Sequence, residues 1–86
     1  MTRLWTNAEK IQVELNESGW PARFTWQGQA HPVQQIRQRW QVDGDWWSEA
    51  GHVWREYIAL TTVDGLLCVI YFDLLDQTWH LSRMYD

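Results

Sequence analysis

The sequence has few of the residues that form disulfides or bind metals. Its 86 residues include one cysteine, Cys68, so no disulfide can form within the chain. Cys68 lies in an apolar run, where a thiol is usually buried and inert. The three histidines, His31, His52 and His80, form no compact ligand spacing with one another or with Cys68. These patterns predict no metal site and no cofactor.

Other absences narrow the class of protein. No apolar run approaches the roughly 20 residues of a membrane helix. The N-terminus has no basic-then-apolar segment typical of a signal peptide. We therefore expect a cytoplasmic protein without a membrane partner. No Ser or Cys occupies a nucleophile elbow, and no glycine loop precedes a helix. Glu56 and Asp73 are expected to face each other, but solvated charges or an arginine partner explain them better than a catalytic dyad. The sequence predicts no enzyme.

Aromatic residues are plentiful. Eight Trp, three Tyr and two Phe provide the large apolar area that a single small domain, residues 1–86, needs for its core. The net charge of −4 argues against a general nucleic-acid binder. Residues 18–42, however, contain three arginines, six glutamines and no acid.

Alternating apolar and polar residues predict antiparallel strands throughout the chain. Residues 1–9 either pack through Leu4 and Trp5 or fray. Asp64-Gly65 predicts a two-residue type I′ turn that pairs Val63 with Leu66. After a four-residue loop, Phe72 pairs with Trp79. The expected strands cover residues 10–15, 22–27, about 31–42, and three further runs between 53 and 86.

About six short strands predict an all-β domain: a strongly bent antiparallel sheet or a partly open barrel of SH3-like or OB-like size. Residues 43–51 form a loop, with one short helical turn expected near 46–50. The Trp46-Trp47 pair in this loop either plugs a barrel end, covers a sheet face or stacks on a ligand.

The expected second hairpin predicts a basic surface. A three-residue loop that pairs Gln27 with His31 places Phe24 and Trp26 on one face. Arg23, Arg37 and Arg39 then share the other face. Positive charge near tryptophans is typical of single-stranded nucleic-acid grooves. An acidic protein partner would use the same arginines. Arginines that only keep the surface soluble would give the same sequence pattern.

The last three strands are apolar on both faces in the expected register, whereas a sheet with one wet face should alternate more sharply. Either the N-terminal strands and Trp46-Trp47 cover the second face, or another molecule does. That molecule would be a protein partner or a second copy of the chain. The interface residues expected on this face are Ile58, Leu60, Val69, Tyr71 and Met84.

Short motifs in a fixed order carry a family resemblance. They are Phe24–Val33, Arg39–Trp47, Arg55–Tyr57, Asp64-Gly65, Tyr71–Asp73, Trp79–Leu81 and Tyr85-Asp86. From about residue 22 to the end, the chain resembles the small uncharacterised C-terminal domain of ImuB-type proteins, which are catalytically degenerate relatives of Y-family DNA polymerases. The polymerase domains are not part of this sequence.

The resemblance implies a role beside the bacterial damage-tolerance (translesion synthesis) machinery and supplies no catalytic residues. It also marks Arg55, which would form either a structural ion pair or a contact with a partner. Three functions remain open: a protein-interaction module, a single-stranded nucleic-acid binder, and a self-associating domain.

Overall fold

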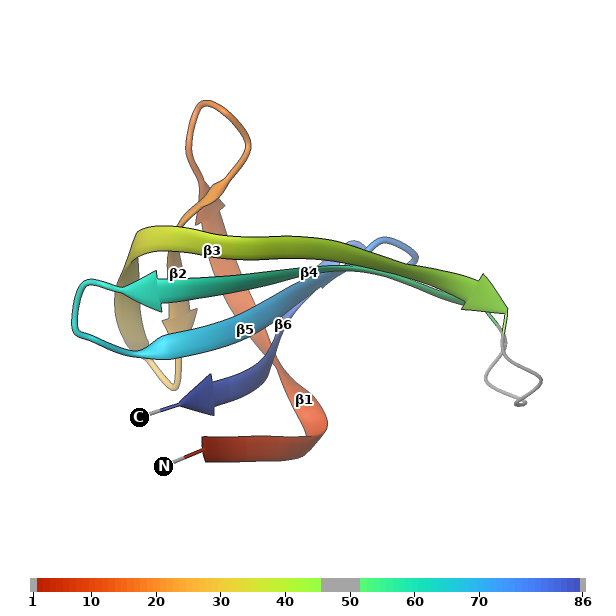
Figure 1. The fold of residues 1–86 in the computed structure, drawn as a ribbon, viewed down its shortest axis with the longest axis horizontal. Coiled ribbons are helices and arrows are strands. Elements are labelled where there is room, and N and C mark those ends of the chain that lie inside the picture. The colour runs from red at the N-terminus through yellow and green to blue at the C-terminus, as the bar shows by residue number, and fades with distance from the viewer. Residues whose placement is uncertain (1, 46–51, 86) are drawn as a thin grey trace.

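A computed structural model describes the backbone of residues 2–45 and 52–85, and the side chains of residues 9–44 and 54–85. These residues form six antiparallel strands that close into a small barrel in sequence order, β6 pairing with β1. The described part of the chain contains no helix that could span a membrane. The strands are β1 (Thr2–Leu15), β2 (Pro21–Trp26), β3 (Gln29–Asp45), β4 (His52–Thr62), β5 (Leu67–Asp73) and β6 (Thr78–Tyr85) (Figure 1).

The all-β class and the six strands predicted from the sequence are confirmed, and the barrel is closed rather than open. β1 is longer than expected because it includes residues 2–9, which pair with β6. β3 also extends beyond its predicted ends, and its last residues form a ribbon with β4 that leaves the barrel (Figure 1). The helical turn expected near residues 46–50 lies outside the described residues.

The β2–β3 register predicted from the sequence is wrong. Gln27 and Gly28 both have positive φ, 52° and 77°, so this hairpin has a two-residue turn of the type I′ class. Phe24 consequently pairs with His31 and not with Gln34. The sum of the two residue numbers in each β2–β3 pair, called here the pairing sum, therefore changes by an odd number. Every side chain on β3 consequently moves to the other face relative to β2.

The β4–β5 register predicted from the sequence is also wrong. Its loop is longer than predicted, whereas the β2–β3 loop is shorter. Only Gly65 has positive φ, at 91°, and the Gly65 N–H donates to the Thr62 carbonyl at 3.0 Å. This three-residue loop pairs Thr61 with Leu67 and Leu60 with Cys68. The corrected register separates an inner from an outer face, so the apparent excess of apolar residues on both faces came largely from the wrong register.

Beside its loop the β5–β6 hairpin matches its prediction, but the register shifts between Val69 and Ile70, which pairs Met84 with Cys68. Phe72 pairs with Trp79, and their ring centroids lie 5.0 Å apart. Asp73 organises the loop, since its Oδ1 accepts the N–H groups of Leu75 and Asp76 at 3.0 and 3.2 Å.

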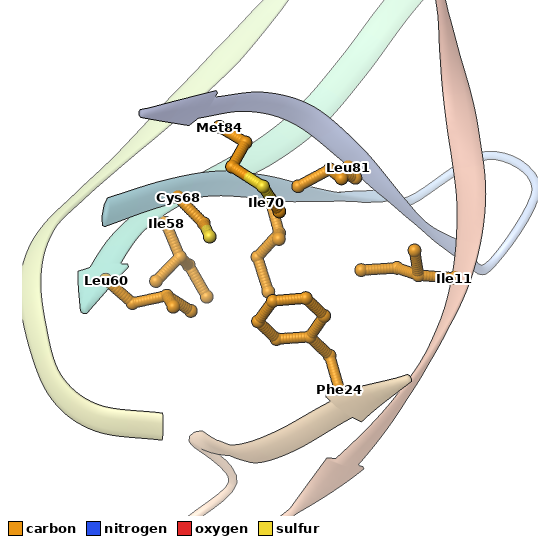
Figure 2. Close-up of a cluster of buried hydrophobic side chains, with 8 residues drawn as sticks. All are labelled: Ile11, Phe24, Ile58, Leu60, Cys68, Ile70, Leu81 and Met84. Carbon is orange, nitrogen blue, oxygen red and sulfur yellow. The ribbon is translucent and has the colours of Figure 1, made fainter. Parts of the chain in front are cut away.

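The core lies inside the barrel and receives side chains from most strands. Figure 2 shows Phe24 reaching from β2 toward Ile70 on β5. Ile58, Leu60 and Met84 were expected on an intermolecular surface, but they are buried in this core. The full cluster is Ile11, Phe24, Ile58, Leu60, Cys68, Ile70, Leu81 and Met84.

Cys68 and Asp64 have perturbed pKa values. Burial raises the pKa of the Cys68 thiol to about 12, so this buried thiol stays protonated. His31, also buried, contacts Asp64 on the β4–β5 loop, with Nδ1 and Oδ2 at 3.2 Å. The pKa of Asp64 is lowered, chiefly by a hydrogen bond from the Thr62 side chain, with a smaller contribution from His31.

We expect truncation of the core to cost far more than truncation of the surface. Phe24→Ala should lower the free energy of unfolding by about 3–5 kcal/mol, and the milder Ile70→Val by about 0.5–1.5 kcal/mol. Urea denaturation measures both. Leu75→Ala, at an exposed loop residue, is the control and should change stability by less than about 0.5 kcal/mol. Equal effects of Ile70→Val and Leu75→Ala would contradict this packing.

Asp64→Asn tests the Asp64 contacts while keeping a residue suited to the turn. Because the folded carboxyl has a lowered pKa, its stabilising effect is present above the unfolded pKa of about 3.9 and is lost as pH falls through the folded value. Wild type should therefore be the more stable protein at about pH 5, and the difference should shrink toward about pH 3. A difference that widens on acidification would show that the pKa is not lowered.

Candidate functional site

The second half of β3 is the most open element of the barrel. β2 pairs only with residues 29–32 of β3, and from Val33 onward β3 pairs with β4 alone. Irregularities between Val33 and Gln35 and between Ile36 and Gln38 bend the strand away from β2. All seven residues from Arg37 to Asp43 are exposed. This segment therefore meets solvent on both faces and has no strand on one edge.

Four rings form a continuous row on the outer face of the barrel, one from each of β3, β4, β5 and β6. They are Trp40, Tyr57, Tyr71 and His80, called here the ring row. Each ring is in register with the next across its strand pair. Successive centroids lie 5.4, 5.0 and 4.9 Å apart, distances typical of favourable aromatic pairs.

Arg55 covers the centre of the ring row. Its guanidinium carbon lies 4.7 Å from the centroid of Tyr71, and Nη1 donates to the Tyr57 hydroxyl at 3.4 Å. The hydrogen bond to Tyr57 is the main cause of the raised pKa of Arg55, to which Asp73, across the strand pair, also contributes. Arg55 is therefore anchored within the chain.

The outer face is covered largely by its own side chains. Tyr71 is only 6% exposed and Val69 only 8%. Both were expected at an interface, and both lie on this outer face, next to Tyr57 and Ala59 in register. Burial raises the pKa of Tyr71, and the nearby Arg55 charge only partly opposes this. Trp40, 37% exposed, is the open end of the row.

A pocket of about 300 Å³ occupies one end of the barrel, called here the mouth pocket. The Asn16 side chain accepts the N–H groups of Ser18 and Trp20 at 2.9 and 3.0 Å, which shapes the loop that carries Trp20. The pocket residues used below are Trp20, Arg39, Glu56, Phe72, Leu74 and Trp79.

A charged pair lies in the wall of the mouth pocket. Arg39 Nη2 donates to Glu56 Oε2 at 3.2 Å, and the Arg39 guanidinium lies 5.1 Å from the Trp20 ring centroid. Glu56 is opposite Phe72 across the strand pair, and not opposite Asp73 as the sequence suggested. Glu56 therefore pairs with an arginine, which was one of the alternatives expected from the sequence.

The basic face predicted from the sequence is not formed. Arg23 pairs with Glu14 across β1 and β2, with Nε to Oε2 at 2.8 Å. Arg39 is in register with the inward-facing Ile58 and lines the mouth pocket, while Arg37 is exposed at a strand irregularity. The three arginines are separated because the real register and the bends in β3 turn them to different sides.

The remaining predictions concern Trp46, Trp47 and the absence of a metal site. Trp46 and Trp47 lie outside the described residues. Within residues 9–44 and 54–85, no group of three His, Cys, Asp or Glu side chains is arranged to hold a metal ion.

Sequence reasoning missed both the ring row and the mouth pocket. Gln27-Gly28 was an available signal for the β2–β3 register only, because a glycine at the second position suits a two-residue turn. The ring row depends instead on the three-residue β4–β5 loop, which pairs Tyr57 with Tyr71, and on the β3–β4 register, which pairs Trp40 with Tyr57.

A family model described as a domain of unknown function, DUF6504, matches residues 3–86. The chain belongs to this family. No curated protein and no solved structure matches the chain. The family spans the whole barrel, including β1, which the motif-based resemblance did not cover.

Ionisation of Tyr71 tests the packing of the ring row. Because burial raises its pKa, one of the three tyrosines should ionise late in an alkaline absorbance titration. Tyr71→Phe should remove this late step, whereas Tyr85→Phe should leave it in place. Circular dichroism at each pH verifies that the barrel is folded. Loss of the late step in both variants, or in neither, would contradict the burial of Tyr71.

Proposed function

We propose that this chain is a non-enzymatic protein-interaction module that acts beside the bacterial damage-tolerance (translesion synthesis) machinery. The binding surface in this proposal is the outer face of β3 and β4, centred on Trp40 at the open end of the ring row. The partner is a protein of the translesion-synthesis accessory class, as the resemblance to ImuB-type domains implies.

The ring row is the observation that carries the proposal. A barrel buries its core on the inside, so its own packing does not require four aligned rings on the outside. Trp, Tyr and Arg are the residues most enriched among those that dominate binding energy at protein interfaces. Here they occur together, with Arg55 held across Tyr57 and Tyr71.

The openness of β3 adds support. Trp40 and Val42 are both exposed on the segment that has no strand on one edge. A partner segment that pairs with this edge would satisfy its free backbone groups and cover Trp40 at the same time. The rings hold one another in place through their stacking, so binding would require little side-chain ordering.

The two rival functions have no geometric observation of their own. A single-strand groove that depends on Arg23, Arg37 and Arg39 would need them on one surface, and Arg23 and Arg39 already pair with Glu14 and Glu56. Self-association would use the same open edge of β3, and the light-scattering result below distinguishes it from binding of a partner.

The proposal is tested by calorimetric titration of the full chain with the ImuB-type protein of a bacterium that carries it. We expect saturable binding that Trp40→Ala weakens by at least about 30-fold, the effect of removing a dominant interface tryptophan. Val63→Ala, at an exposed residue of the β4–β5 loop, is the matched control and should bind like wild type.

Three results would count against the proposal. One is no binding to the ImuB-type protein, together with unchanged damage-induced mutation in a strain that lacks the chain. Another is a stable dimer by light scattering that Trp40→Ala dissociates, since it would assign the ring row to self-association. The third is binding of a thymine-only oligonucleotide at low salt that Arg37→Ala abolishes, since it would favour a nucleic-acid groove.

A further inference from the structure

We propose that the mouth pocket binds a single guanine base, carried either by a free nucleotide or by an unpaired nucleic-acid strand. This site goes beyond the proposed interaction function and lies at a different place on the barrel. Inward-facing residues line the mouth pocket, whereas the ring row is on the outer face.

Three aromatic side chains line the pocket. Trp20 comes from the β1–β2 loop, while Phe72 and Trp79 come from paired positions on β5 and β6. Planar bases stack favourably on such rings. A volume of about 300 Å³ is at the small end of ligand pockets, so the pocket suits a base with its sugar and phosphate outside.

The charged pair Arg39 and Glu56 favours a ligand that is uncharged where it meets the pocket. Arg39 and Glu56 pair with each other, so their charges cancel and neither a phosphate nor an ammonium group finds an unopposed charge. An arginine has five N–H donors, and a carboxylate has about four acceptor sites. Within the described residues, neither side chain makes a hydrogen bond other than the one between them. Donors and acceptors therefore remain for a ligand.

Guanine matches this pair better than the other bases do. Its O6 and N7 accept hydrogen bonds from arginine, the commonest specific contact between proteins and bases. Its N1–H and N2–H groups, on the adjoining edge, are donors that a carboxylate accepts. Adenine offers N7 as an acceptor and its N6 amino group as a donor, so it can make one hydrogen bond to Arg39 and one to Glu56, where guanine can make two to each.

Stability alone does not explain why a charged pair lies here. Glu56 is 28% exposed and Arg39 51% exposed, and ion pairs this open contribute little to folding. The apolar side chain of a partner protein would also fit between the rings, but it would cover both charged groups without matching their hydrogen bonds. A base satisfies the rings and the charged pair together.

The test is a two-dimensional NMR titration of the full chain with GMP, and with AMP, CMP and UMP for comparison. GMP should shift the indole N–H signals of Trp20 and Trp79 and should bind at least about tenfold more tightly than AMP, the discrimination expected of a matched base edge. Trp20→Ala and Glu56→Gln should each weaken GMP binding about tenfold. Their spectra without ligand verify that the barrel is folded.

Trp40→Ala is the matched control, since it removes a ring of the outer row and leaves the mouth pocket intact. It should bind GMP like wild type and bind the ImuB-type protein more weakly. Trp20→Ala should bind GMP more weakly and bind the ImuB-type protein like wild type. The two proposals can therefore fail separately. A pentanucleotide with one guanine among thymines, compared with GMP, identifies the source of the base. Tighter binding of the strand indicates nucleic acid, and tighter binding of GMP indicates a free nucleotide.

Several outcomes would overturn the guanine site. One is no shift of the Trp20 or Trp79 signals at millimolar GMP. Another is equal binding of GMP and AMP, since it would mean that Arg39 and Glu56 do not recognise the base edge. A third is loss of the ImuB-type protein in Trp20→Ala without any nucleotide binding, which would assign the pocket to a partner side chain.

Discussion

Closure of the barrel depends on β1 and β3, two long strands that pair with different neighbours along different parts of their length. β1 pairs with β6 through its first part and with β2 through its last residues, and β3 leaves β2 after Pro32 to follow β4. This division lets six strands enclose a core built around Phe24 and Ile70. It also leaves the second half of β3 without a partner on one edge. The open surface of the protein is thus a direct consequence of how the barrel closes.

β4 carries both candidate sites because successive side chains of a strand point to opposite faces. Arg55 and Tyr57 face outward and belong to the ring row with its covering guanidinium. Glu56 and Ile58 face inward, where Glu56 joins Arg39 at the mouth pocket and Ile58 enters the core. Four consecutive residues therefore serve an outer surface, a pocket and the core. A shift of register by one residue would disrupt all three.

The two sites differ in how firmly the fold supports them. Three of the four rings in the row come from strands paired on both sides, and Tyr71 is nearly buried. The mouth pocket instead depends partly on the loop that carries Trp20, whose conformation is held by the Asn16 side chain. Changes on the outer face should therefore leave the barrel end unaffected, which makes the two surfaces separable by mutation.

Much of this fold follows from the sequence alone. Alternation of apolar and polar residues indicated six antiparallel strands, and the β5–β6 hairpin followed from its four-residue loop and the pairing of Phe72 with Trp79. The length and aromatic content indicated one small core, and the position of Cys68 indicated a buried thiol.

Only the tertiary structure decided which residues share a face. The predicted loops of the β2–β3 and β4–β5 hairpins were three and two residues long, whereas the real loops have two and three. Each error changes the pairing sum by an odd number, which exchanges the inner and outer faces of paired strands. Arg39 therefore moved from an expected basic surface into a pocket, and Ile58 and Leu60 moved from an expected interface into the core. Met84 joins them for another reason, because a register shift between Val69 and Ile70 pairs it with Cys68. Local patterns report the period of a strand, but register is set by loop geometry and by what the closed barrel can bury.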